Sequence, residues 1–189
     1  MRLILASGSP RRADLLRSVG LEFEIDPADV DESVHPGEHA VTYVERVAGD
    51  KCATVAARHS RRDVIVLAAD TTVSVHGEIL GKPADDVEAA GMLARLAGRT
   101  HQVHTAVAVW AGGLTLRQLV TTGVTFGELT ADEIAWYVAR GESLDKAGGY
   151  GMQSAGAALV AGIVGSPSNV IGLPLHETLQ ILRTAGLSW

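Results

Sequence analysis

The sequence predicts an α/β protein in which helices alternate with the strands of a mixed sheet, and three observations support this. Two short apolar runs, residues 3–6 and 64–69, are typical of strands buried on both faces. Residues 101–110 and 114–126 have the pattern of antiparallel strands, and two glycines join them. Segments with a helical spacing of apolar residues lie between the strands. We expect one domain, residues 1–189, with two lobes around a cleft.

The bulk composition excludes several classes of protein. With 189 residues, of which 47% are apolar and 20% charged, the chain resembles an ordinary soluble globular protein. A net charge of −6 argues against a nucleic-acid-binding surface. No apolar run approaches the roughly 18 residues needed to span a bilayer, and the first apolar residues are too few for a signal peptide. The lone Cys52 excludes an internal disulfide and fits a reducing compartment. We therefore expect a cytoplasmic protein without nucleic-acid or membrane partners.

The first strand, residues 3–6, leads into a loop and a helix that carry a candidate anion site. Pro10 suits the first helical position after a possible Ser9 N-cap, and the helix extends to about residue 19. Arg11 and Arg12 occupy the first turn, although the helix dipole there favours anions. Two guanidinium groups beside a hydroxyl-bearing loop and free backbone N–H groups would bind an anion strongly. A solvated basic turn is the alternative.

Two further candidates follow in the next segments. After a possible strand at residues 21–25, an acid-rich stretch includes Glu32, which lies either in a solvated loop or across a cleft from Asp70. Two such carboxylates would suffice for Mg²⁺, which also binds phosphate oxygens. Residues 39–58 have helical spacing, and Lys51 lies at the border of the apolar stripe. A lysine there commonly extends to solvent, which is the alternative to a place in the cleft.

The apolar run at residues 64–69 leads directly into Asp70 and Thr71. A carboxylate at the end of a buried strand lies where α/β proteins bind their ligands. The alternative is that Asp70 caps a turn or pairs with an arginine. A hairpin is expected at residues 73–80, and Lys82 follows on a loop because the next residue is proline.

The C-terminal half contains one candidate binding loop. Residues 145–153 are dense in glycine and lie between a helix and a strand, and Gln153 offers both the donor and the acceptor needed to read a base edge. His101 and His104 lie three apart on a strand, so they face opposite sides and are predicted to be structural. The remaining elements are two helices with capping boxes, one strand and a final helix, at residues 85–98, 130–140, 157–164 and 174–185.

Taken together, the candidate residues are complementary to a polyphosphate with a divalent metal ion. Arginine and lysine neutralise phosphates, carboxylates hold the metal, and a water activated by the metal or by a carboxylate would attack phosphorus. The sequence lacks the phosphate-binding P-loop, the G-x-S-x-G nucleophile motif and a Cys/His metal spacing. The cationic candidates are Arg11, Arg12, Lys51 and Lys82, and the carboxylates are Glu32 and Asp70.

Several short motifs, in this order, resemble the Maf family of nucleoside triphosphate pyrophosphatases. The motifs are Ser7-Gly8-Ser9-Pro10-Arg11-Arg12, Ala69-Asp70-Thr71, Gly81-Lys82-Pro83, DKAGGYGMQ at residues 145–153, and Gly172-Leu173-Pro174-Leu175. The resemblance implies an elongated mixed sheet with flanking helices and a cleft between two lobes, as in the inosine triphosphate pyrophosphatases. It also implies a homodimer, a divalent cation (Mg²⁺ or Mn²⁺), and cleavage between the α and β phosphates of a nucleoside triphosphate.

The same resemblance implies roles for individual residues. Asp70 is the expected general base, and Glu32 is its expected partner at the metal. The expected substrate-binding residues are Ser7, Arg11, Arg12, Lys51, Thr71, Lys82 and Gln153; within this set Arg12, Thr71 and Gln153 match positions tied to substrate choice. Gly-Met-Gln at residues 151–153 is similar to the branch that acts on dTTP and UTP. Ser154 and Pro167 depart from the family pattern near the expected base pocket.

Two other functions stay open at this point. One is a non-catalytic nucleotide-binding regulator of septum formation or cell division, which would bind nucleotides with negligible turnover. The other is a phosphatase that releases orthophosphate instead of pyrophosphate.

Overall fold

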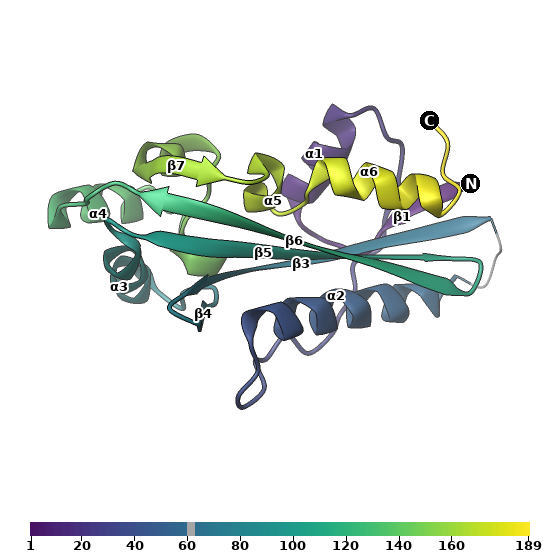
Figure 1. Ribbon diagram of the computed structural model, residues 1–189, viewed down its shortest axis with the longest axis horizontal. Helices are drawn as coiled ribbons and strands as arrows, with labels where there is room; N and C mark the ends of the chain where they lie inside the picture. The colour runs from purple at the N-terminus through teal and green to yellow at the C-terminus, as the bar shows by residue number, and fades with distance from the viewer. Residues whose placement is uncertain (60–62) are drawn as a thin grey trace.

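The computed structural model describes residues 1–59 and 63–189, and in it a mixed seven-stranded sheet runs the length of an elongated molecule with helices on both faces (Figure 1). The strands are β1 (Arg2–Leu5), β2 (Glu24–Ile25), β3 (Val64–Val75), β4 (Glu78–Leu80), β5 (Thr100–Ala111), β6 (Leu114–Phe126) and β7 (Val160–Val164). The α-helices are α1 (Pro10–Ser18), α2 (Ala40–Ala56), α3 (Asp86–Leu96), α4 (Ala131–Val138), α5 (Pro167–Ile171) and α6 (Leu175–Thr184). Two 3₁₀ helices are η1 (Ala147–Gly149) and η2 (Ser154–Leu159).

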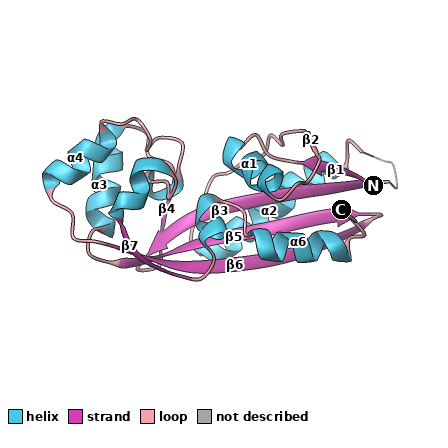
Figure 2. Ribbon diagram, turned by 90° about the horizontal axis from the view of Figure 1, so that it is seen from above, coloured by secondary structure: helices cyan, strands magenta, loops and turns pink. Residues whose placement is uncertain are grey.

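The sheet has the order β2-β1-β3-β5-β6-β7, and β4 pairs with β3 outside this path. β1 is parallel to β2 and β3, whereas β3, β5, β6 and β7 are antiparallel, so the prediction of a mixed α/β sheet is confirmed. Figure 2 shows α3 and α4 at one end of the long strands and α1, α2 and α6 at the other. β3, β5 and β6 extend through both ends, which we call the α3–α4 lobe and the α2 lobe.

The core consists of three apolar clusters that cover the two faces of the sheet. In the α2 lobe, α2 packs on one face against Val66 and Ala106, while α1 and α6 pack on the other against Leu67. In the α3–α4 lobe, Leu93 and Phe126 belong to the third cluster. Each fully buried side chain of this size contributes about 1.5–3 kcal/mol of transfer free energy. None of the described helices has both the length and the apolar character to cross a membrane.

Local signals in the sequence correctly located most elements. Thr130 and Glu133 form the predicted capping box of α4. The hairpin between β3 and β4 turns at His76 and Gly77, which both have positive φ, as predicted. At α3, Asp85 accepts the Glu88 N–H at 2.8 Å, but Glu88 Oε2 accepts from the N–H of the residue before Asp85, so the reciprocal half of that capping box is absent. Ser9 precedes α1 at the N-cap position without a side-chain capping bond.

Two predicted strand boundaries were wrong, and one short helix was not predicted. The second strand covers only Glu24–Ile25 instead of residues 21–25. The strand predicted at residues 157–164 begins at Val160, because η2 occupies the preceding residues. A side chain at Gly156 would collide with the carbonyl oxygen of Gly151, so η2 lies directly on the glycine-rich loop. The short helix α5 was not predicted, although Ser166 caps it by accepting the Asn169 N–H.

Two helical glycines provide a matched test of this packing. Gly91 is exposed in the middle of α3, and a Cβ atom added there would meet nothing within 4 Å, whereas at Gly49 in α2 it would lie 3.1 Å from Arg117 Nη2. Because alanine has the higher helix propensity, Gly91→Ala is expected to raise the free energy of unfolding by about 1 kcal/mol. Gly49→Ala should raise the free energy of unfolding by less, because the side chain of Arg117 has to move. Urea unfolding of both variants tests this, and equal gains would contradict it.

Candidate active site

The candidate active site lies at an interruption in the strand pairing of β3. On one side of β3, the pairing with β1 ends at Leu67, opposite Leu5, and the pairing with β4 starts at Val73, opposite Leu80. Within the described ranges, no strand pairs with residues 68–72 on this side. A cleft of about 580 Å³ opens here between the two lobes, within the size range of small-molecule sites.

Asp70 lies in this interruption, in the middle of β3. The prediction that it ends the strand is therefore wrong. The chain continues as a strand because Thr71, Thr72 and Val73 are β-branched and because β5 pairs with β3 along this whole stretch. Asp70 and Thr71 point to opposite faces of the sheet, and both reach the cleft because the edge beside them is open.

The carboxylate of Asp70 is held by the ammonium group of Lys51. Lys51 Nζ lies 2.8 Å from Asp70 Oδ1 and 2.7 Å from Glu32 Oε1, and Lys51 and Asp70 are 7% and 6% exposed. The interpretation that Lys51 extends to solvent is wrong, as is the pairing of Asp70 with an arginine. Lys51 lies one turn after Val47 on the buried face of α2, and two carboxylates compensate for the burial of its charge.

The same lysine and Tyr43 determine the environment of Glu32. Burial alone would raise the pKa of Glu32, but its hydrogen bond to Lys51 and the nearby positive charges hold that pKa below its usual value. The hydroxyl of Tyr43 donates to the backbone oxygen of Glu32 at 3.0 Å and thereby orders the acid-rich loop. Burial and the charges of Asp70 and Glu32 raise the pKa of Tyr43 to about 12, so its hydroxyl keeps its proton at neutral pH.

On the other face of β3, Arg12 joins three segments of the chain. Its Nε donates to Gly172 O at 2.8 Å, Nη1 to Ser7 Oγ at 3.2 Å and Nη2 to Thr71 Oγ1 at 3.1 Å. Burial lowers the pKa of the guanidinium, against the opposing charge of Asp70. Ser7 also accepts the N–H of Ser9 at 3.2 Å, which fixes the loop before α1. The alternative of a solvated basic turn is therefore wrong for Arg12.

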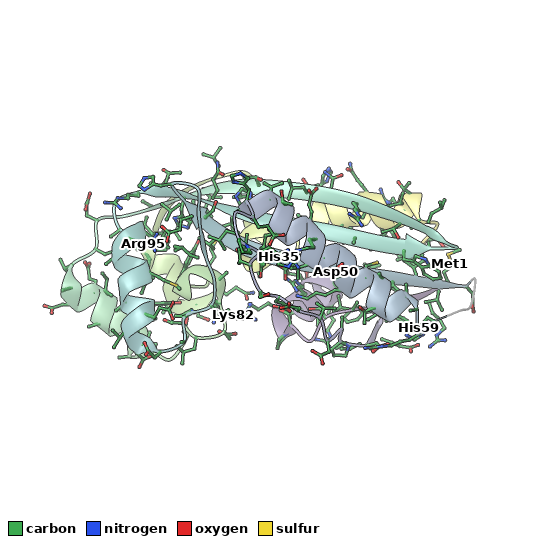
Figure 3. The ribbon with its side chains drawn as sticks, turned by 90° about the horizontal axis from the view of Figure 1, so that it is seen from below. Met1, His35, Asp50, His59, Lys82 and Arg95 are labelled. Carbon is green, nitrogen blue, oxygen red and sulfur yellow. The ribbon has the colours of Figure 1, made fainter. Side chains whose placement is uncertain are left out.

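Arg11 spans the cleft to the glycine-rich loop. Its Nη1 lies 2.5 Å from Asp145 Oδ2, and Asp145 also pairs with Lys146 at 2.6 Å. Lys82 lies between the two lobes on the loop between β4 and α3 (Figure 3). Its side chain makes no hydrogen bond or ion pair among residues 1–59 and 63–189, and its charge helps to lower the pKa of Glu32. Cationic groups from both lobes thus face the same space.

The glycine-rich loop requires glycine where it passes closest to β3. Gly148 has a φ of +73°, and a Cβ atom there would lie 3.1 Å from a methyl group of Val73. Its N–H donates to the oxygen of Gly81 at 2.9 Å, which ties this loop to the Lys82 loop. Gln153 follows, exposed at the wall of the cleft. The cleft is lined by all nine predicted site residues: Ser7, Arg11, Arg12, Glu32, Lys51, Asp70, Thr71, Lys82 and Gln153.

Comparison with known proteins identifies the family of this chain. A family model described as a Maf-like protein matches residues 2–185. The chain belongs to the Maf family. It is 52% identical over 185 residues to a dTTP/UTP pyrophosphatase of Myxococcus xanthus, covering 98% of this chain and 93% of that protein. It is 51% identical over 187 residues to a dTTP/UTP pyrophosphatase of Methylobacillus flagellatus, covering 99% and 94%. Among solved structures, "The structure of the Staphylococcus aureus Ham1 protein" matches with a TM-score of 0.49 and 16% identity over 67% of this chain and 72% of that chain.

Membership of the Maf family confirms the resemblance predicted from the motifs, but some residues of the cleft were not predicted. Tyr43 lies eight residues before Lys51 on α2, so helical spacing could have placed both on one face. Thr105 does not line the cleft but supports it: it is fully buried, and its hydroxyl oxygen lies 3.0 Å from that of Thr71. Only the pairing register of β3 with β5 brings these two threonines together, and the sequence does not specify that register.

Proposed function

We propose that this Maf-family protein hydrolyses nucleoside triphosphates of the dTTP and UTP type to the monophosphate and pyrophosphate. The observation that carries the proposal is the buried Asp70–Lys51 pair at the base of a cleft that cationic side chains enter from both lobes. The names of the relatives at about half sequence identity support the same reaction and the same bases.

In this proposal, Asp70 is the general base. Its carboxylate accepts a proton from a water molecule as the water oxygen attacks the α-phosphorus. The bond from the α-phosphorus to the bridging oxygen breaks, and pyrophosphate leaves. Lys51 fixes the orientation of the Asp70 carboxylate through the bond at Oδ1, which leaves the lone pairs of Oδ2 for the attacking water and for a divalent cation.

The triphosphate is bound by groups from both lobes. Arg11 and Lys82 contribute positive charge from opposite sides of the cleft. The backbone N–H groups at the start of α1 also favour the binding of an anion. Arg12 holds Ser7 and Thr71 in place beside the ligand. Gln153 reads the edge of the base with its amide, since it lines the same cleft and its amide can both donate and accept.

The residues present fit a divalent cation that the substrate helps to hold. Among the described residues no group of three or more His, Cys, Asp or Glu side chains could bind a metal alone. Glu32 and Asp70 each use one oxygen for Lys51, and the second oxygen of each has no protein partner in the described parts of the chain. Such a pair matches Mg²⁺ or Mn²⁺, which need only one or two carboxylates when phosphates complete the shell. When bound, the cation would neutralise charge on the phosphates and on the leaving pyrophosphate.

The decisive experiment is a panel of nucleoside triphosphates incubated with the purified protein and Mg²⁺ or Mn²⁺, with pyrophosphate and orthophosphate assayed separately. We expect pyrophosphate, released fastest from dTTP and UTP. Orthophosphate alone would indicate a phosphatase, and tight nucleotide binding with no product would indicate a regulator. The proposal also includes a cytoplasmic location, which rests on the single cysteine and the lack of a long apolar run, and a homodimer, which rests on the family resemblance. Light scattering of the purified protein gives its mass.

A further inference from the structure

Two tyrosine hydroxyls fasten the loop that carries Gln153, and the proposed reaction uses neither of them. The hydroxyl oxygen of Tyr150 lies 2.6 Å from Nε2 of His101, which belongs to β5. One residue further along the loop, the N–H of Gly151 donates to the hydroxyl oxygen of Tyr137 in α4, at 3.1 Å. The loop is therefore anchored to a strand and to a helix immediately before Gln153.

His101 is an unusual anchor because it is almost fully enclosed. It is 1% exposed, and its ring packs edge-to-face on Phe126 and Tyr150 at centroid distances of 5.0 and 5.3 Å. Burial lowers the pKa of His101 to about 4, so the imidazole is neutral at physiological pH. Among the described residues, Nδ1 of His101 has no hydrogen-bond partner. The ring therefore makes one directed polar contact, and that contact goes to the loop.

The hydrogen bond to Tyr150 can form with either tautomer of the neutral ring. A tyrosine hydroxyl can donate to Nε2 or accept from it, so the contact at 2.6 Å needs no charge on the imidazole. Tyr150 is 5% exposed, and it lines the cleft three residues before Gln153.

We propose that His101 is a positioning residue for nucleotide selection, acting through Tyr150 to hold residues 151–153 where Gln153 meets the base. This inference rests on the proposed function. The groups that act on the phosphates come mainly from α1, α2 and β3, outside this anchored loop. Loosening the loop should therefore weaken base discrimination and binding more than it slows the chemical step.

His104 provides a matched control on the same strand. It is 4% exposed, and its ring nitrogens contact Ser74 on β3 and Thr121 on β6 at 3.0 and 2.8 Å, with no contact to the loop. His101→Leu is expected to raise KM for UTP, and to lower the preference for UTP over GTP, by about three- to tenfold, the range for one lost buried hydrogen bond. His104→Leu should leave this preference unchanged. Equal effects of the two variants, or an unchanged preference in His101→Leu, would overturn the inference.

Tyr150→Phe removes the same hydrogen bond while keeping the aromatic ring, so it tests the inference if His101→Leu fails to fold. We expect Tyr150→Phe to lower the preference for UTP over GTP as much as His101→Leu does. The double variant His101→Leu/Tyr150→Phe should show no further loss. His101→Gln should retain part of the preference, because its amide can donate to Tyr150. Full preference in Tyr150→Phe would overturn the inference.

Equilibrium binding of UTP and GTP gives a readout that does not need turnover. Absence of pyrophosphate release by the wild-type protein would refute the proposed function, whereas normal wild-type release with unchanged preference in Tyr150→Phe would refute only this inference.

Discussion

Replacement of Asp70 by asparagine is expected to lower kcat for pyrophosphate release by about 10²–10⁴-fold, the usual contribution of a positioned general base. Asparagine retains an oxygen for Lys51, so the 2.8 Å contact can persist and the fold should remain intact. The amide cannot accept the proton of the attacking water, so the loss should appear in kcat with little change in nucleotide binding.

The control for this variant is Asp50→Asn. Asp50 precedes Lys51 on α2, and its side chain is 55% exposed. The same change of charge there should leave kcat within about twofold of the wild-type value, because a surface substitution of this kind has little energetic effect. Pyrophosphate release by Asp70→Asn at the wild-type rate would remove Asp70 from the mechanism.

Lys51→Met should damage both stability and activity. Lys51 and Asp70 are both nearly buried, and removing one partner of a buried ion pair typically costs about 3–5 kcal/mol because the other charge is left uncompensated. Methionine fills most of the same volume. We expect a loss near the lower end of this range, since the second carboxylate, Glu32, is 43% exposed. Urea unfolding at neutral pH measures it.

Lys82→Met is the matched comparison. Lys82 is exposed on a loop, so its loss should change the free energy of unfolding by less than about 0.5 kcal/mol. Its positive charge faces the cleft, so KM for the nucleotide should still rise. A comparable loss of stability in both lysine variants would show that Lys51 is not an internal counter-charge.

The instability of Lys51→Met should depend on pH in a defined direction. The pKa of Glu32 in the folded protein is held below its usual 4.5, so its ion pair stabilises the fold above that value and ceases to do so as pH falls through the lower, folded pKa. In Lys51→Met this contribution is absent, and two carboxylates face each other without the ammonium. The stability difference from wild type should therefore be largest near pH 7 and shrink below about pH 4. A difference that grows on acidification would contradict the assignment.

Much of the fold could be predicted because the signals are local. The apolar run before Asp70, the turn at His76 and the capping box at Thr130 each depend on a few neighbouring residues. The length of β3 could not be predicted in this way, because its second half is fixed by pairing with β5 and β4. Likewise, η2 replaces the start of a predicted strand because of the close approach of Gly156 to Gly151.

In the candidate site, too, local signals predicted the residues better than the contacts between them. The short motifs contain seven of the nine predicted residues that line the cleft, all except Glu32 and Lys51, but they do not specify the contacts of these residues. Lys51 contacts Asp70 because α2 lies flat on β3, and Arg12 reaches Gly172 across 160 positions of the chain. His101 was predicted to be structural from its strand position, and its bond to Tyr150 depends on how the loop folds back. Such contacts arise from packing, which a single sequence encodes only indirectly.

The long strands β3, β5 and β6 also limit how this protein can be divided or recombined. Each strand contributes side chains to the cores of both lobes, as Leu67 and Val73 of β3 illustrate. Neither lobe therefore exists as a separable module that could be exchanged with that of a relative. New substrate preferences in such an architecture have to arise by replacing residues in the loops across the cleft, while the shared strands keep their sequence.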